Sequence, residues 1–174
     1  LSSARKVTTK RGEQVARISD MKMRYRIFMK NYKYRSLEWK RGVSLRKPLS
    51  KSRIAIVSTA ALHTPDQEPF DGSISGGDAS FRVIREDTQL ETLRESHPSE
   101  SFDHGGLEAD PNLAMPTERF RELTAQGKIG DSAPRHLSFM GIILNPEKLI
   151  NETAEQASEI LTEDKVDGVL LVPV

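Results

Sequence analysis

Four histidines lie in or beside irregular stretches that are rich in proline, glycine and aspartate, and such loops often carry chemistry. They are His63, His97, His104 and His136. Imidazole changes its charge near neutral pH, so histidines gathered in loops can hold a metal ion or move a proton. Their spacing matches no ligand interval, and the metalloprotease pattern H-E-x-x-H is absent. We therefore predict no metal site, and a metal-dependent hydrolase that uses these histidines stays as an alternative hypothesis.

Other catalytic motifs are absent or incomplete. The sequence has no cysteine, which excludes disulfides, thiolate zinc sites and a cysteine nucleophile within these 174 residues. No G-x-S-x-G elbow follows a predicted strand, so nothing indicates a serine hydrolase. Gly76-Gly77-Asp78 lacks the preceding strand and following helix of a phosphate-binding loop, and is typical of a turn. Arg135, next to His136, either positions an anion or forms a buried structural pair.

Charge divides the sequence into a basic arm and an acidic body. Residues 1–53 hold 17 lysines and arginines against three acidic residues, whereas the remainder holds nine against 22. A basic arm of this kind binds nucleic acid or an anionic membrane, or it docks on its own acidic body or on a partner protein. No motif that reads RNA or DNA accompanies it, so nucleic acid and membrane are not the partners we expect.

Hydropathy gives no sign of membrane insertion or export. No apolar stretch reaches the ~18 residues of a membrane span, and the N-terminus lacks the apolar core of a signal peptide. We therefore expect a cytoplasmic protein.

The N-terminal part is predicted to form a disordered tail, a helix and a connector. Residues 1–11 have little hydrophobicity and are predicted to be disordered. From residue 13 to residue 34, large side chains recur at steps of three and four, which predicts an amphipathic helix. A proline-containing connector follows, so residues 12–50 form a basic helix with its connector.

The rest of the sequence alternates between strand and helix patterns. Short apolar runs at 53–59 and 169–172 predict two buried parallel strands, and apolar spacing at 117–127 and 146–164 predicts two helices. Between them we expect long irregular stretches at 60–80 and 96–116, one or two helical turns at 88–95 and a loop-like segment at 132–144. This order favours an α/β fold, namely a partial doubly wound (Rossmann-like) parallel sheet with long loops, in which residues 51–174 form the N-terminal part of a larger domain.

Several segments resemble one known family when taken in order along the chain. They are residues 46–50, 57–63, 67–71, 77–84, 102–104, 130–141 and 166–174. Together they resemble the glycine/sarcosine/betaine/D-proline reductase selenoprotein B family, from about Trp39 to the last residue. The resemblance implies an oxidoreductase component for reductive cleavage of a C–N bond, linked to disulfide or thioredoxin chemistry. The alternative is a non-catalytic binding module that uses the basic N-terminal arm on nucleic acid or an anionic membrane.

The family resemblance also implies which groups carry the redox chemistry. In that family a selenocysteine or cysteine follows directly after the strand that corresponds to residues 169–174, so we expect it just beyond Val174 and expect this chain alone to be inactive. No cofactor is expected in this chain, and a pyruvoyl group on a partner subunit would bind the substrate amine. The implied partners are reductase subunits, a small selenoprotein or thioredoxin-like protein and a small-molecule substrate, with a homo-oligomer as a further option.

Ligands of α/β sheets bind beyond the carboxyl ends of the strands, here at Ser58-Thr59 and Pro173-Val174. The resemblance implies that His63, His104 and His136 surround the redox group as acid/base groups, whereas His97 is a weaker candidate. It further implies substrate binding by four residues, namely Thr59, Glu68, Arg135 and Ser138. We therefore expect Val174 to lie beside the imidazoles and Arg135.

Overall fold

The computed structural model describes residues 22–31, 43–99, 102 and 104–174. The chain divides into two units, residues 1–42 and 43–174, which are described separately. The predictions for residues 1–11, and for the parts of the basic segment at 12–21 and 32–42, lie outside the described residues.

In the first unit, α1 spans Met23–Asn31. This confirms the predicted helix over those residues, and Arg24, Arg26 and Lys30 give the helix its positive charge. Among the described residues of both units, no helix has the length and apolar character that crossing a membrane requires.

The second unit contains a mixed sheet. Its strands are β1 (Arg53–Ser58), β3 (Phe81–Arg85), β5 (Asp131–Ser132), β6 (Arg135–Phe139) and β7 (Gly168–Val172). Ile54 pairs with both Ser132 and Gly168, and Ser58 pairs with both Ser138 and Val172. A strand has only two edges, so β7 lies along one edge of β1 while β5 and β6 follow one another along the other.

Strands β5, β6 and β7 run parallel to β1, whereas β3 pairs antiparallel with β6. The α/β class is therefore confirmed, and the expectation of a wholly parallel sheet is wrong at β3. The Rossmann-like arrangement stays a prediction. A second, two-stranded sheet joins β2 (Leu62–His63) to β4 (Arg94–Glu95).

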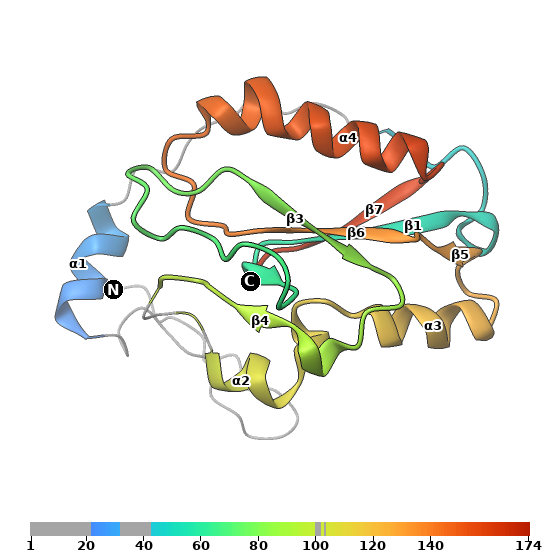
Figure 1. Ribbon diagram of the computed structural model, residues 1–174, viewed down its shortest axis with the longest axis horizontal. Coiled ribbons are helices and arrows are strands. Elements are labelled where there is room, and N and C mark those ends of the chain that lie inside the picture. The colour runs from blue at the N-terminus through green and yellow to red at the C-terminus, as the bar shows by residue number, and fades with distance from the viewer. Residues whose placement is uncertain (1–21, 32–42, 100–101, 103) are drawn as a thin grey trace, which may run out of the picture. The chain divides into compact units, whose positions relative to one another are not determined.

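The helices of this unit cover both faces of the sheet. They are α2 (His104–Ala109), α3 (Thr117–Ala125) and α4 (Ala154–Glu163), with a π-helical turn at Leu149–Thr153 and 3₁₀ turns at Leu49–Lys51, Leu90–Thr92 and Pro111–Leu113. In Figure 1, α4 lies on one side of the sheet and α3 on the other. Ala157 of α4 packs against Leu137 and Phe139, whereas Phe120 of α3 packs in the cluster of Ile54 and Ile56.

The two predicted helices after residue 116 are confirmed. At α3, Thr117 is the first helical residue and Pro116 occupies the cap position. Gly127 follows α3 with a φ of +67°, as a residue that ends a helix in the left-handed region should.

Several segments differ from the sequence-based prediction, since β2 lies in the stretch 60–80 and β4 in the segment 88–95. The segment 132–144 contains β6 instead of a loop, the stretch 96–116 contains α2, and β3 was not predicted. The short β3 and β6 carry charged residues among their apolar ones, and the sheet context rather than a hydrophobic run determines their conformation.

Strand β7 forms where it was predicted but is not buried. Val169, Leu170 and Leu171 are 40%, 42% and 69% exposed. Among the described residues β7 pairs with β1 and with no second strand, so it lies at an edge of the sheet. Its apolar run resembles that of a central strand, which is why the sequence suggested burial.

Candidate functional site

The ends of β1, β6 and β7 meet at one edge of the sheet because the three strands are parallel. Thr59, the residue after β1, donates its backbone N–H to Val172 O over 3.2 Å. In return, its Oγ1 accepts a hydrogen bond from the backbone N–H of Val174 at 3.0 Å. The carboxyl end of β7 is therefore fastened to that of β1 through a side chain that was predicted to bind substrate.

Gly141 brings the end of β6 close to this point. Its φ is +68°, in the region that favours glycine. A Cβ at this position would lie 3.0 Å from Thr59 O, 3.4 Å from Thr59 Cβ and 3.6 Å from His97 Nε2. Thr59 and His97 thus flank the same point of the β6 end. We call the group of Thr59, His97, Gly141 and Val174 the strand-end site.

His97 is the histidine that reaches this site, although the sequence made it the weaker candidate. It is 7% exposed, and its ring stacks on Phe102 with centroids 4.4 Å apart. Its Nδ1 accepts a hydrogen bond from the Ser99 N–H at 3.3 Å, so in the neutral ring the proton is on Nε2, the nitrogen near Gly141. Burial lowers the pKa of His97 below its usual value despite the nearby Glu95, and the ring is neutral at pH 7.

Glu95 connects His97 to His104. One of its carboxylate oxygens accepts the backbone N–H of His97, and the other lies 2.5 Å from His104 Nδ1. His104 Nε2 is 3.1 Å from Ser99 O, so both ring nitrogens of His104 face acceptors. Glu95 and His104 also line a surface pocket of about 530 Å³. His104 is thus tied to the segment that carries His97, and its own ring is half exposed.

His63 and Glu68 lie on the irregular stretch after β1. His63, on β2, is 4% exposed, and its Nδ1 is 2.9 Å from Thr64 O. Glu68 is exposed, and its backbone carbonyl accepts a hydrogen bond from Arg82 Nε at 2.6 Å. Arg82 also lies over the Phe70 ring at 4.3 Å from its centroid. These contacts fasten the long loop to β3, and the roles of His63 and Glu68 stay predictions.

His136 lies in the core of the protein. It is fully buried on β6, and its Nδ1 accepts a hydrogen bond from the backbone N–H of Ile56 at 3.1 Å. Ile56 lies on β1 between the residues that pair with β5 and those that pair with β6. Burial, together with the positive charge of Arg121, lowers its pKa to about 4. The neutral ring thus accepts the Ile56 N–H in place of the backbone carbonyl that a neighbouring strand would supply. Ser138, also fully buried, accepts the Leu62 N–H on its Oγ at 2.8 Å.

Arg135 lies at the opposite end of β6 from Gly141. Its guanidinium contacts Asp164 at 2.7 Å and 2.8 Å and Glu163 at 2.9 Å, and these carboxylates raise its pKa further. Arg135 begins a strand that runs parallel to β1, whereas Val174 follows the end of one. The expectation that Arg135 lies beside Val174 is therefore wrong. Substrate binding by Arg135 stays a prediction.

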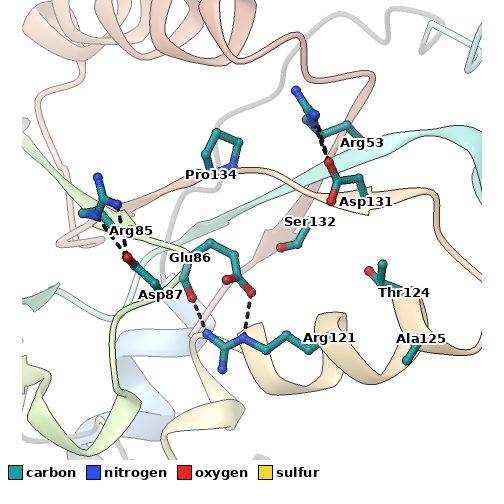
Figure 2. A pocket seen from close by; sticks show the side chains of 10 residues that line it. All are labelled: Arg53, Arg85, Glu86, Asp87, Arg121, Thr124, Ala125, Asp131, Ser132 and Pro134. Carbon is teal, nitrogen blue, oxygen red and sulfur yellow. Dashed lines mark hydrogen bonds and ion pairs between the residues drawn. The ribbon is translucent and has the colours of Figure 1, made fainter.

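A further pocket, of about 630 Å³, lies at the amino ends of β1 and β5 (Figure 2). Its arginines face carboxylates: Arg53 is 2.9 Å from Asp131, and Arg121 is 2.8 Å from Glu86. Figure 2 also shows Arg85 against Asp87. These pairs balance the charge of the pocket. Within the part of the chain that the structure describes, no group of three or more His, Asp or Glu side chains is arranged to hold a metal ion.

Comparison with known proteins shows similarity to a reductase subunit. Over 125 residues the chain is 33% identical to D-proline reductase subunit gamma of Acetoanaerobium sticklandii. This chain is similar to a reductase subunit. The aligned region covers 72% of the chain and 50% of that protein, so the chain spans about half the length of the curated relative it matches.

The similarity to the D-proline reductase subunit supports the resemblance to the amino-acid reductase family without selecting among its glycine, sarcosine, betaine and D-proline members. No family model matches the chain, and no solved structure matches it.

Proposed function

We propose that this chain is a component of a reductase that cleaves a C–N bond of a small amine substrate. The observation that carries the proposal is the 33% identity to D-proline reductase subunit gamma over 72% of the chain. We further propose that a selenocysteine or cysteine follows Val174 in the full-length protein. The position of Val174 supports this, because its backbone is held at the carboxyl edge of the sheet, where α/β proteins bind ligands.

Reductive cleavage of a C–N bond consumes two electrons and two protons and yields one C–H and one N–H bond. A dithiol of a thioredoxin-like protein supplies both by becoming a disulfide. The group after Val174, when present, would carry the attack on the substrate carbon. In this chain Thr59 would orient the backbone that leads to that group, because its Oγ1 accepts the Val174 N–H.

Partners follow from the same proposal. The relative is named as a subunit, which supports assembly with other reductase subunits. We propose that one of them carries a pyruvoyl group, which binds the substrate amine, and that a small selenoprotein or thioredoxin-like protein is the electron donor. Thiol chemistry of this kind needs a reducing compartment, so we place the protein in the cytoplasm.

The gene provides the first test. Reading the coding DNA past codon 174 should give TGA followed by an open frame, or a cysteine codon. A conventional stop codon without continuation would overturn the proposed redox position.

Activity provides the second test. The full-length protein, reconstituted with its partner subunits and a dithiol, should cleave one of D-proline, glycine, sarcosine or betaine. Replacing the residue after Val174 by serine should abolish turnover. Failure of the assembled protein on all four substrates, or unchanged activity of the serine variant, would contradict the proposal.

A further inference from the structure

We propose that the open edge of β7 is the surface on which the rest of the reductase subunit continues this sheet with a further strand. The occupant is the polypeptide that corresponds to the half of D-proline reductase subunit gamma outside the aligned region. This inference rests on the proposed function, because it takes the chain as part of such a subunit. Its support is the state of both edges of the sheet and of both faces of β7.

The first step is the backbone of β7. Val172 O accepts a hydrogen bond from the Thr59 N–H, so Val172 faces β1. Successive residues of a strand direct their N–H and C=O groups to opposite edges, so Val169 and Leu171 direct theirs to the open edge. Within the part of the chain that the structure describes, those groups have no hydrogen-bond partner. Pro173 has no N–H and ends the stretch that a further strand can pair with.

The second step is the exposure of both faces of β7. Residues paired between neighbouring strands share a face, and the pairs here are Ile56 with Leu170 and Val57 with Leu171. The cluster around Ile56 includes α3, and the cluster around Val57 includes α4. Ile56 is fully buried, whereas Leu170 beside it is 42% exposed. On the other face Val57 is partly buried and Leu171 is 69% exposed. The helical cover therefore does not extend from β1 over β7.

The third step is the contrast with β3, which lies at the other edge of the sheet. Arg82 and Arg85 interrupt the apolar residues of β3, and Gln67 of the preceding loop donates from Nε2 to Val83 O at 2.9 Å. Charged residues and a covering loop are the means by which proteins keep a sheet edge from pairing with another strand. The sequence of β7 is Gly-Val-Leu-Leu-Val, which carries no charge. The edge of β7 is therefore suited to pair with a further strand.

The fourth step is the size of the occupant. A short peptide would pair with the edge but leave both faces of β7 open. A second copy that paired through its own β7 would bring the same uncovered side chains to the contact. Covering the edge and both faces requires a strand with layers on either side, as in the interior of α/β proteins. The aligned residues are 50% of the relative, so an equal length of polypeptide lies outside the match and supplies this cover.

Amide exchange at β7, measured by NMR, tests the proposal in the 174-residue chain and in the full-length subunit. In the 174-residue chain the Leu171 N–H should exchange about 100-fold faster than the Leu170 N–H, which faces β1. In the full-length subunit both amides are paired, so their exchange rates should lie within about tenfold of each other.

A charge at the edge gives a second measurement. Leu171→Lys should leave the Tm of the 174-residue chain within about 2 °C of the wild-type value, because this side chain is largely in water. In the full-length subunit the same substitution places an ammonium group in an apolar interior and should lower the Tm by about 5–10 °C. Leu113→Lys is the matched control, because Leu113 is 58% exposed on a 3₁₀ turn, and it should leave both forms within about 2 °C.

Fast exchange of the Leu171 N–H in the full-length subunit would overturn the proposal. Slow exchange in the 174-residue chain would do the same, because another part of this chain or, where sedimentation gives a dimer, a second copy would then cover the edge. Equal effects of Leu171→Lys on the two forms would also contradict it. A full-length subunit that protects Leu171 but cleaves none of the amine substrates would remove the proposed function and leave this inference standing. Turnover with an unprotected Leu171 amide would remove the inference alone.

Discussion

The Oγ1 atom of Thr59 accepts the backbone N–H of Val174 at 3.0 Å, and this bond joins two residues that are 115 positions apart. It closes the carboxyl edge of the β1–β7 pair one residue beyond the regular ladder, since Thr59 N already donates to Val172 O. The side chain of Thr59 thus fixes the direction in which the chain leaves β7. Under the proposed function, that direction determines where the redox group lies.

Replacing the Thr59 hydroxyl by a methyl group should loosen this edge. Thr59→Val keeps the shape of the side chain but leaves the Val174 N–H without its acceptor, which should lower the free energy of unfolding by about 1 kcal/mol. Amide exchange at Val174 should become several-fold faster in this variant. Thr59→Ser, which retains the hydroxyl, is the matched control and should exchange at nearly the wild-type rate. Equal exchange in Thr59→Val and wild type would show that the bond does not hold the strand end.

Alanine substitutions at two glycines with the same backbone conformation distinguish the cost of backbone strain from the cost of steric crowding. Gly127 and Gly141 have φ of +67° and +68°. A Cβ on Gly127 would meet no atom within 4 Å, whereas one on Gly141 would lie 3.0 Å from Thr59 O. Gly127→Ala should therefore lower the free energy of unfolding by about 1 kcal/mol, because alanine disfavours the left-handed conformation. Gly141→Ala should lower it by about 1–3 kcal/mol more, because the added Cβ also crowds Thr59.

Urea denaturation of the two glycine variants measures the difference. Thermal shifts should follow the same order. If both variants lost the same stability, the close approach of Gly141 to Thr59 and His97 would not exist in solution.

The sequence predicted the elements whose apolar residues follow a regular period. The apolar run of β1 and the apolar spacing of α3 and α4 were sufficient to predict these three elements, because each element buries a continuous face. Strands β3 and β6 could not be predicted in the same way. Arg82, Arg85, Arg135 and His136 interrupt their apolar pattern, and their conformation is determined by pairing with one another, which depends on contacts distant in sequence.

The sequence predicted only part of the candidate site, again because some of its residues depend on contacts distant in sequence. Thr59 and Val174 follow from the strand ends alone, since parallel strands bring their carboxyl ends to one edge. Residue type did not distinguish His97 from His136: one lies in a loop beside Gly141 and the other in the ladder. Gly141, directly after the strand residues 137–139 and Met140, was the one signal that could have indicated a close approach there.

Arg135 should stabilise the fold by holding the end of α4. Arg135→Gln leaves Asp164, whose side chain is 10% exposed, without its cation, and Arg135 itself is 30% exposed. Because the pair is partly solvated, we expect a loss of about 1–2 kcal/mol, less than for a fully buried ion pair. Urea denaturation measures this loss, and unchanged stability of Arg135→Gln would contradict the ion pairs that Arg135 forms with Glu163 and Asp164.

Acid should destabilise the protein through His136. The folded state lowers the pKa of this ring to about 4, whereas the unfolded chain titrates near 6.5. Between these values the unfolded chain binds a proton that the folded protein does not, so the free energy of unfolding falls as the pH falls, by about 3 kcal/mol in total. Urea denaturation from pH 7 to pH 4 measures this slope.

The control for this pH dependence is His136→Asn, which offers Oδ1 to the Ile56 N–H but does not titrate. Its stability should be lower at pH 7 but less dependent on pH between 6.5 and 4. The NMR titration of the His136 ring in the wild-type protein gives an independent result, since a midpoint above pH 6 would contradict the burial that the structure describes.

The exposed face of β7 leads to the last prediction. Ile56 and Leu170 are paired across the β1–β7 ladder and are 0% and 42% exposed. Ile56→Ala should lower the free energy of unfolding by about 2–5 kcal/mol, because it leaves a cavity in the core. Leu170→Ala removes apolar area that is already partly in water and should cost about 1 kcal/mol. Comparable losses for the two variants would show that the edge of β7 is covered in solution, because only burial makes a leucine as costly to truncate as Ile56.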